Sequence, residues 1–451
     1  MSIREHRDLL ATLTSILGPE RVVTDPEAQR RHLYDRDFAL YSPLLATALA
    51  GLDVAVVVRP AGVEELTAVV AAAVDHRVPI TVRGAGTGNY GQSLPLEGGL
   101  LIDTRGMDRV LEVTEEEVTV EAGAVLSRAE AAARRQGREI RVLPSTYRVS
   151  TAAGYVAGGS GGLGSITYGR LWDDNVRWVE LLTAEDPPQL LRLDGPDARA
   201  AIHTYGVVGI ITRAALALAP ARPWREAVAT FDRFETAARF AIAVASDPAI
   251  PKRLCSLQEA PIPTFFDPVK HLFTDRDAAV LLMVDAGGLE RTEELAARFG
   301  GTLRPWPERP PISQFPFSHT ILWSKKHDPA SSWLQLRFAP DRFFEQVDAM
   351  RDRFGPVILQ HVELIAGPAG VEFDGISVVR DAAPPVVDAI IRYCEAIGVQ
   401  VLNPHSYVVE EGGMVTDLAQ VLALKRRTDP YGLLNPGKIG RTFYQKQIAH
   451  V

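Results

Sequence analysis

The hydrophobic pattern of residues 54–136 alternates between short apolar runs and longer amphipathic ones. Residues 54–58 form an apolar run that predicts a buried strand. Residues 63–76 carry apolar side chains at helical spacing and two glutamates in the first turn, which together predict a helix. The other elements predicted in this part are strands at 79–82, 100–103, 110–113 and 118–121 and a helix at 126–136 that Gly137 closes.

A break rich in proline and alanine at residues 219–223 separates this pattern from a second one. The elements predicted after the break are helices at 234–246, 290–299, 341–354 and 385–397 and strands at 278–284 and 333–338. Two rounds of strand and helix favour an α+β domain built on an antiparallel sheet. Residues 399–409 are strand-like again, and a helix predicted at 417–427 precedes the turn-rich residues 429–438.

Length and composition bound the class of protein. At 451 residues the chain exceeds one hydrophobic core, so we expect two domains. Its net charge of −8 and pI near 5.8 argue against nucleic acid as a partner. Two cysteines, Cys255 and Cys394, are too few for a disulfide framework or a cysteine-ligated metal site. No run reaches the ~18 apolar residues of a membrane span, and the N-terminus lacks a signal-peptide pattern, so we expect a cytoplasmic protein.

A glycine-rich loop, residues 83–88 with the sequence Arg-Gly-Ala-Gly-Thr-Gly, follows the strand predicted at 79–82. The loop starts like a dinucleotide-binding fingerprint, but Asn89 stands at the third glycine position and Pro95 argues against a helix behind it. Without that helix there is no helix N-terminus to hold a pyrophosphate. Rossmann dehydrogenases and kinases are therefore disfavoured, and the loop alone also fits an ordinary turn between strands.

A second tract of small residues, 151–169, has the sequence Gly-Gly-Ser-Gly-Gly at residues 158–162. Apolar residues such as Val156 and Leu163 are interleaved with the glycines, which disfavours a flexible linker. Small residues let the backbone approach a ligand closely, and consecutive free N–H groups form anion sites. Two such loops in one chain therefore suggest one extended, phosphate-bearing cofactor.

The order of these loops and of several other segments resembles the FAD-binding domain of the vanillyl-alcohol oxidase superfamily, also called the p-cresol methylhydroxylase (PCMH) type. The segments that carry the resemblance are 57–60, 82–88, 120–123, 143–146, 151–157, 165–169, 174–176, 205–212 and 434–438. Glycolate-oxidase-subunit and D-lactate-dehydrogenase-like FAD-linked oxidases are the members it resembles in particular. The resemblance implies a two-domain α+β fold. Its parts would be an FAD-binding domain at 1–220, a cap domain at 221–400 on an antiparallel sheet, and a segment at 401–451 that returns to the FAD domain.

The resemblance also implies which residues hold FAD, chiefly through backbone groups. The first loop would cradle the pyrophosphate, the second tract would follow the ribityl chain and the ring, and residues 206–211 would touch the adenine. The implied residues are Arg83, Gly84, Ala85, Gly86, Thr87, Gly88, Asn89, Pro144, Ser145, Thr151, Gly154, Ala157, Gly159, Ser160, Gly162, Ser165, Tyr168, Gly206, Gly209 and Ile211. Thr87 stands where some relatives carry a histidine bonded to the flavin, so we expect non-covalent FAD.

Flavin oxidation of an alcohol needs a base for the hydroxyl proton, and the sequence offers several candidates. The resemblance places the segment around His405 and Tyr407 opposite the flavin, as base and hydrogen-bond donor. His319, Lys326 and the following strand residue Arg337 have a composition suited to a carboxylate substrate. Each of these residues also fits a purely structural role, as a histidine in a domain interface or a lysine in an exposed turn.

Glu363 is a further catalytic candidate, because His361 and Glu363 share one face of a predicted strand. In some relatives such a pair assists a bound metal. The rest of the histidine- and glutamate-rich metal motif of the D-lactate dehydrogenase group is missing, so we predict no metal.

The sequence thus predicts an FAD-dependent oxidoreductase that oxidises a small hydroxy acid or alcohol by hydride transfer to flavin N5. Two other activities stay open: an oxidative decarboxylase of a carboxylic acid in natural-product biosynthesis, and a flavin subunit of a larger dehydrogenase complex. A non-catalytic scaffold is a weaker interpretation. The electron acceptor would be oxygen or a separate carrier, and homo-oligomerisation stays open.

Overall fold

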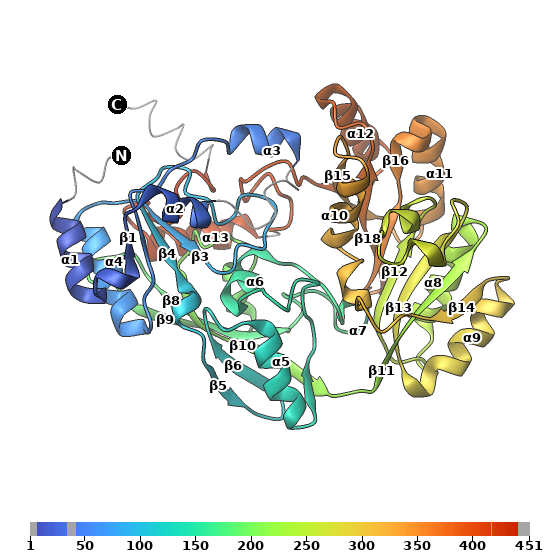
Figure 1. The fold of residues 1–451 in the computed structure, drawn as a ribbon, viewed down its shortest axis with the longest axis horizontal. Helices are drawn as coiled ribbons and strands as arrows, with labels where there is room; N and C mark the ends of the chain where they lie inside the picture. Colours follow the sequence, from blue (N-terminus) through green and yellow to red (C-terminus); the bar gives the residue numbers. More distant parts are fainter. Residues whose placement is uncertain (1–6, 34–41, 416, 441–451) are drawn as a thin grey trace.

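The structure is a computed structural model that describes residues 7–33, 42–415 and 417–440. The chain folds into two lobes, one holding the blue to green part of the chain and the other the yellow-green to orange part (Figure 1). Two sheets build the first lobe, and one nine-stranded sheet builds the second. Among the described residues, no helix is both long and apolar enough to span a bilayer.

The first sheet of the first lobe has four strands. In sheet order they are β1 (Val22–Val23), β2 (Val56–Val58), β4 (Leu100–Asp103) and β3 (Ile80–Arg83). Strands β2, β4 and β3 run parallel, and every residue of β2 and β4 is buried, as expected for parallel strands covered on both faces. The accompanying helices are α1 (Arg7–Leu17), α2 (Pro26–Leu33), α3 (Pro43–Ala48) and α4 (Val63–Asp75). Strand β3 ends where the first glycine loop begins, and Gly84 of that loop packs against Thr151, directly before helix α6 (Ala152–Gly158).

The second sheet of the first lobe has six strands, and all of its pairs are antiparallel. They are β5 (Val110–Val113), β6 (Glu117–Glu121), β7 (Arg138–Ile140), β8 (Val176–Leu182), β9 (Leu190–Asp194) and the long central β10 (Ile210–Pro220). Three helices accompany it: α5 (Leu126–Arg135), α6 (Ala152–Gly158) and α7 (Ser165–Tyr168). Helix α6 packs on β6 and β10, which fixes the start of the second small-residue tract on this sheet.

The second lobe is one antiparallel sheet with four helices on the face that points away from the first lobe. Its strands, in sheet order, are β14 (Thr302–Pro305), β11 (Trp224–Phe231), β13 (Ala278–Asp285), β12 (Lys252–Gln258), β17 (His361–Gly367), β18 (Gly370–Val379), β15 (Ser332–Phe338) and β19 (Gln400–Leu402), with β16 (Ile358–Leu359) beside β18. The covering helices are α8 (Phe234–Ser246), α9 (Leu289–Arg298), α11 (Phe343–Phe354) and α12 (Pro384–Ala396). Alternate residues of the strands, such as Leu254 and Leu281, face the first lobe instead.

The chain returns to the first lobe after β19. Helix α13 (Leu418–Thr428) ends beside the lobe, where the Thr428 hydroxyl donates to the Val208 carbonyl at 2.7 Å. Further on, the Lys438 ammonium donates to the Gln92 carbonyl at 2.5 Å. These contacts, and the end of β10 at Pro220, support the domain division at 220 and near 401 that we propose.

One predicted element is shorter than expected. Residues 399–409 read as strand-like, but only Gln400–Leu402 pair in the sheet. The reason is local, because Pro404 has no N–H for a ladder and the Asn403 side chain accepts the His405 N–H at 2.9 Å instead. The backbone therefore turns away from the sheet at the segment expected to carry the catalytic base.

A buried arginine connects the two lobes. The Arg170 guanidinium, after helix α7, binds Glu372 at 2.7 Å and Asp374 at 2.7 Å, both on β18. The Arg170 side chain is 6% exposed, and burial without these carboxylates would be costly for its charge.

We expect the substitution Arg170→Met to lower the free energy of unfolding by about 2–3 kcal/mol, because it leaves two carboxylates without their shared cation. Those carboxylates keep 24% and 22% of their side chains exposed, so water compensates part of the loss. Urea unfolding measures the change, with the exposed Arg233→Met as control. Equal stabilities for the two variants would contradict the bridging role.

Candidate active site

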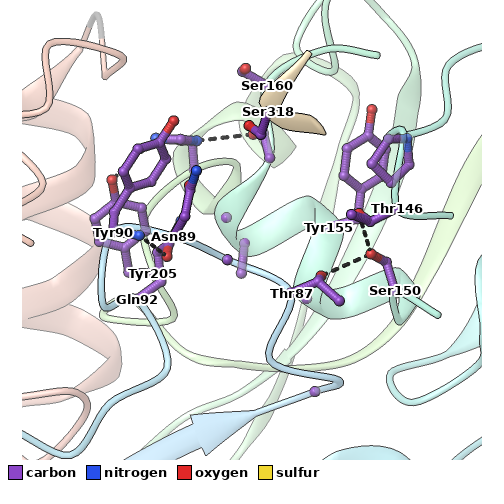
Figure 2. Close-up of a pocket in the computed structure, with 18 of the residues that line it drawn as sticks. Thr87, Asn89, Tyr90, Gln92, Thr146, Ser150, Tyr155, Ser160, Tyr205 and Ser318 are labelled. Carbon is purple, nitrogen blue, oxygen red and sulfur yellow. Dashed lines mark hydrogen bonds between the residues drawn. The ribbon is translucent and has the colours of Figure 1, made fainter. Parts of the chain in front are cut away.

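One cavity lies between the glycine-rich loops of the first lobe and the sheet of the second. Figure 2 shows part of its lining. The first lobe lines it with residues from three segments, 84–93, 144–161 and 203–211. The second lobe lines it with residues of β15, β17 and β18 and with the start of helix α10 (Ser318–His327). The two loops singled out in the sequence thus meet at one site.

The first loop requires glycine because it packs directly against the second tract. A Cβ on Gly84 would lie well under 3.0 Å from the Thr151 hydroxyl. Gly86 has φ of +62°, and a Cβ there would overlap the Arg83 guanidinium, which is buried beneath the loop and donates to Ser93 Oγ at 2.8 Å. Within the described chain, none of the backbone N–H groups of residues 84–89 donates a hydrogen bond to another residue. The loop therefore offers donors to a ligand.

Hydroxyl groups tie the two loops together. Thr87 Oγ1 lies 2.9 Å from Ser150 Oγ, which in turn lies 2.7 Å from Thr146 Oγ1, as the dashed lines in Figure 2 show. Thr87 stands where a covalent histidine would fall in some relatives. In this chain it joins a hydroxyl chain within the cavity wall instead.

The second tract reaches its position through close backbone contacts. A Cβ on Gly162 would overlap the Leu143 carbonyl. A Cβ on Gly164, which has φ of +97°, would overlap the Arg141 carbonyl. Ser165 Oγ accepts the Gly162 N–H at 3.0 Å. The tract therefore lines the cavity up to Gly161 and then turns away from it.

The third segment contains a buried histidine that no motif in the sequence singled out. His203 Nδ1 lies 3.0 Å from the Gly159 carbonyl, and its Nε2 lies 3.3 Å from the Tyr205 hydroxyl. The Tyr205 carbonyl accepts from Asn435 Nδ2 at 2.5 Å, which joins the returning C-terminal segment to the cavity wall. Tyr90 and Gln92 are lining residues that sequence reasoning also missed, because the stretch after the first loop has no periodic pattern.

Most of the predicted cofactor residues line this cavity. Those that do are Gly84, Ala85, Gly86, Thr87, Gly88, Asn89, Pro144, Ser145, Thr151, Gly154, Ala157, Gly159, Ser160, Gly206, Gly209 and Ile211. The other four support the wall: Arg83 and Ser165 through the hydrogen bonds above, Gly162 through its contact with residue 143, and Tyr168 through its carbonyl, which accepts from Asn175 at 2.7 Å.

The polar groups of the wall fit a phosphate-bearing cofactor. The Thr151 hydroxyl is buried and has no hydrogen-bond partner among the described residues, although it faces the loop at Gly84. An unsatisfied buried hydroxyl is costly, and a ligand oxygen beside it would remove that cost. Together with the free N–H groups of residues 84–89, it forms a concave set of donors.

Glu363 is the predicted catalytic residue that lines the cavity. It is buried on β17, and its Oε1 accepts from the Phe317 N–H at 2.7 Å, Ser256 Oγ at 2.9 Å and His361 Nε2 at 2.7 Å. Phe317 is held at φ of +55°, a strained conformation for a bulky residue, and strain of this kind collects at functional sites. Three donors on one oxygen hold the carboxylate in one orientation.

The histidine and tyrosine of the segment after β19 lie elsewhere. His405 is half-buried against the Trp333 ring, with the ring centroids 6.2 Å apart, and Tyr407 packs in a small cluster with Leu49 and Leu94. Neither is among the residues that line the cavity. The turn at Asn403 and Pro404 leads this segment away from the sheet, which places His405 and Tyr407 outside the cavity lining.

The three residues expected to bind a carboxylate also lie outside the lining. Lys326 is exposed, with its ammonium 4.2 Å from the Trp323 ring centroid, and His319 is half-buried beside it on α10. Arg337 Nε donates to Asp374 Oδ1 at 3.0 Å, and the same oxygen accepts from Arg170. Residues 7–33, 42–415 and 417–440 contain no group of three or more metal-ligating side chains.

Burial makes stability depend on pH. It lowers the pKa of His203 and of His319 from 6.5 to about 4. Between these values the unfolded chain binds protons that the folded chain does not. The free energy of unfolding is therefore highest above pH 6.5, where both histidines are neutral in the folded and the unfolded chain. It falls as the pH decreases from 6.5 toward 4.

We expect His203→Asn to reduce the fall in the free energy of unfolding between about pH 6.5 and 4. The limit is ~1.4 kcal/mol per pH unit for one histidine. Urea unfolding of wild type and variant across this range measures the difference. Parallel stability curves would contradict the prediction.

Comparison with known proteins supports an FAD-binding domain in this chain. Residues 54–186 match the family model described as FAD binding domain, and this range contains both glycine loops. Glycolate oxidase subunit GlcD from Bacillus subtilis is 27% identical over 299 residues, which cover 64% of this chain and 61% of that protein, less than two thirds of it. Glycolate oxidase subunit GlcD from Escherichia coli K12 is 24% identical over 426 residues, covering 85% of this chain and 83% of that protein.

Among solved structures, an alkyldihydroxyacetonephosphate synthase has the same fold. It superposes with a TM-score of 0.74 at 16% identity and covers 96% of this chain and 85% of that chain. The likeness therefore extends over both lobes and beyond the matched FAD-binding range.

Proposed function

We propose that this chain is an FAD-dependent oxidoreductase that oxidises a small hydroxy acid or alcohol. The premise is that it carries an FAD-binding domain within a fold of the PCMH type. The observation that carries the proposal is the position of Glu363. A buried, oriented carboxylate faces the glycine loops across one cavity. A proton acceptor and a cofactor cradle on opposite walls are the arrangement that alcohol oxidation needs.

The cofactor would be held by the first loop and the second tract. The N–H groups of residues 84–89 and the Thr151 hydroxyl would bind its phosphates, and residues 206–211 would contact the adenine end. When bound, FAD supplies the two-electron acceptor for the hydrogen on the substrate carbon. Thr87 provides no bond to the flavin, so we propose that FAD is non-covalent and is released into the supernatant when the protein is precipitated with acid.

The chain's own contribution to the reaction would be proton transfer and orientation. Glu363 would take the substrate hydroxyl proton, since its carboxylate is the acidic group on the lining that no arginine or lysine binds. Ser256 and His361 would fix its orientation by donating to Oε1 at 2.9 and 2.7 Å. The surrounding apolar side chains, Ile365 and Ile376 among them, would exclude water.

A second candidate follows from two relatives that are each named as a subunit of glycolate oxidase. In that case this chain would pass electrons to a partner protein rather than to oxygen. Turnover of the purified chain in air, compared with turnover when an artificial electron acceptor is added, separates the two. Oxygen consumption by the chain alone would exclude the need for a partner.

Anaerobic mixing of the yellow holoprotein with a panel of alcohols and hydroxy acids tests the proposal. We expect at least one compound to bleach the flavin absorbance, with the matching aldehyde, ketone or keto acid as product. Carbon dioxide release during bleaching would indicate the decarboxylase instead. A protein that takes up no FAD, or one that no compound reduces, would overturn the proposal.

A further inference from the structure

The wall of the cavity that the second lobe contributes carries carboxylates and uncharged groups. Glu363 on β17 and Asp374 on β18 are the acidic members, and Gln335 on β15 and Ser318 on α10 are neutral hydrogen-bonding members. Apolar side chains from the same strands fill the space between them. This wall lies opposite the cofactor loops, so it is the one that a substrate would meet.

Among the described residues, the arginines near this wall already bind carboxylates of the protein. Arg170 and Arg337 both bind Asp374 Oδ1, at 2.7 and 3.0 Å, and Arg170 also binds Glu372. Two guanidinium groups and two carboxylates balance in this cluster, and Asp374 has its charge compensated there. The lysine expected at the substrate, Lys326, lies on the exposed side of α10.

No arginine or lysine of the described chain binds Glu363. Its three donors are a backbone N–H, a serine hydroxyl and His361, which is fully buried and whose Nδ1 has no hydrogen-bond partner among the described residues. The histidine on the cavity lining, His203, is neutral near pH 7, since burial lowers its pKa to about 4. The described lining therefore offers the carboxylate of a substrate no arginine or lysine, and it places the Glu363 carboxylate in the same cavity.

We propose that the substrate is an alcohol with an apolar body and no charge beside the reacting carbon, and that Glu363 excludes 2-hydroxy acids. The proposal rests on the proposed function and narrows its substrate class to the neutral alcohol. A second carboxylate close to Glu363 would be repelled in a site of low dielectric and would lose its hydration without gaining a cation. A neutral hydroxyl, in contrast, donates a hydrogen bond to the Glu363 carboxylate and leaves its own body among the apolar side chains.

Matched ligands of equal shape test this inference by binding alone. Calorimetry of the holoprotein near neutral pH is run with benzamide and with benzoate, which differ in charge and hardly in size. We expect benzamide to bind at least about tenfold more tightly than benzoate, equivalent to ~1.4 kcal/mol. In Glu363→Gln this ratio should fall several-fold, and in the exposed control Glu345→Gln it should stay as in the wild type. Equal or tighter binding of benzoate by the wild type, no measurable binding of either ligand, or a ratio that Glu363→Gln leaves unchanged, would overturn the inference.

Flavin reduction separates this inference from the proposed function. Benzyl alcohol and mandelate share the ring and the hydroxyl, and mandelate adds a carboxylate at the reacting carbon. Bleaching by benzyl alcohol and not by mandelate supports both proposals, whereas bleaching by mandelate alone supports the oxidoreductase and overturns the substrate class. The protein could also prefer benzamide while no alcohol or hydroxy acid reduces its flavin. That result would overturn the proposed oxidoreductase activity and would support the preference for an uncharged ligand.

Discussion

Replacing Gly84 by alanine is expected to weaken FAD binding by at least about 100-fold, which corresponds to ~3 kcal/mol. A Cβ at this position would lie far inside contact distance of the Thr151 hydroxyl and 3.3 Å from the Thr151 Cβ. Thr151 is itself buried, so either its side chain or the loop must move to relieve the overlap. If the two loops separate, the donors of residues 84–89 move with them.

The double variant Gly84→Ala/Thr151→Ala tests the cause of this loss. Removing the threonine hydroxyl removes the worst overlap, so the double variant should bind FAD more tightly than Gly84→Ala alone. Gly412→Ala is the control, because a Cβ there would meet no atom closer than 3.5 Å and Gly412 is not among the cavity-lining residues. Titration of apoprotein with FAD, followed by flavin fluorescence, gives the FAD affinities of the wild type and the three variants. Wild-type affinity in Gly84→Ala would show that the loops are not in contact in solution.

The cofactor site could be predicted from the sequence because local backbone requirements determine it. Gly84, Gly86 and Gly162 are glycines for steric reasons that hold wherever the loop occurs, and the order of such loops along the chain is read directly. The comparisons confirm the FAD-binding domain and the PCMH-type fold that this order indicated. Strand β4 and helix α8 likewise occur at the residues predicted, since each combines a clear apolar pattern with a marked end.

The substrate wall could not be predicted in the same way. Glu363 acquires its surroundings from Ser256 and Phe317, which are 107 and 46 residues away in the sequence, and only the register of β12 with β17 brings the first of them close. Arg337 has the composition of a carboxylate-binding residue, but the antiparallel pairing of β15 with β18 places Asp374 opposite it. Cross-strand partners of this kind depend on sheet order, which the hydrophobic pattern of a single strand does not contain.

Glu363→Gln is expected to reduce kcat by about 10²–10⁴-fold with the best substrate of the panel, because it removes the proton acceptor and keeps the shape of the side chain. FAD affinity should stay within about twofold of wild type, since Glu363 lies on the wall opposite the phosphate-binding loops. A glutamine in this position also keeps an oxygen that can accept from Phe317 and Ser256. The variant should therefore fold and bind its cofactor.

Rapid mixing of substrate with the oxidised holoprotein measures the rate of flavin bleaching directly, apart from any later step. We expect the loss in Glu363→Gln to fall on this rate, while Glu345→Gln, which removes an exposed carboxylate on α11, should bleach at the wild-type rate. The positioning residue His361 should show an intermediate effect in His361→Gln, because Ser256 and Phe317 still hold the carboxylate. A bleaching rate in Glu363→Gln within about threefold of wild type would assign the proton to another acceptor. His203, the histidine on the same lining, would be the next to test.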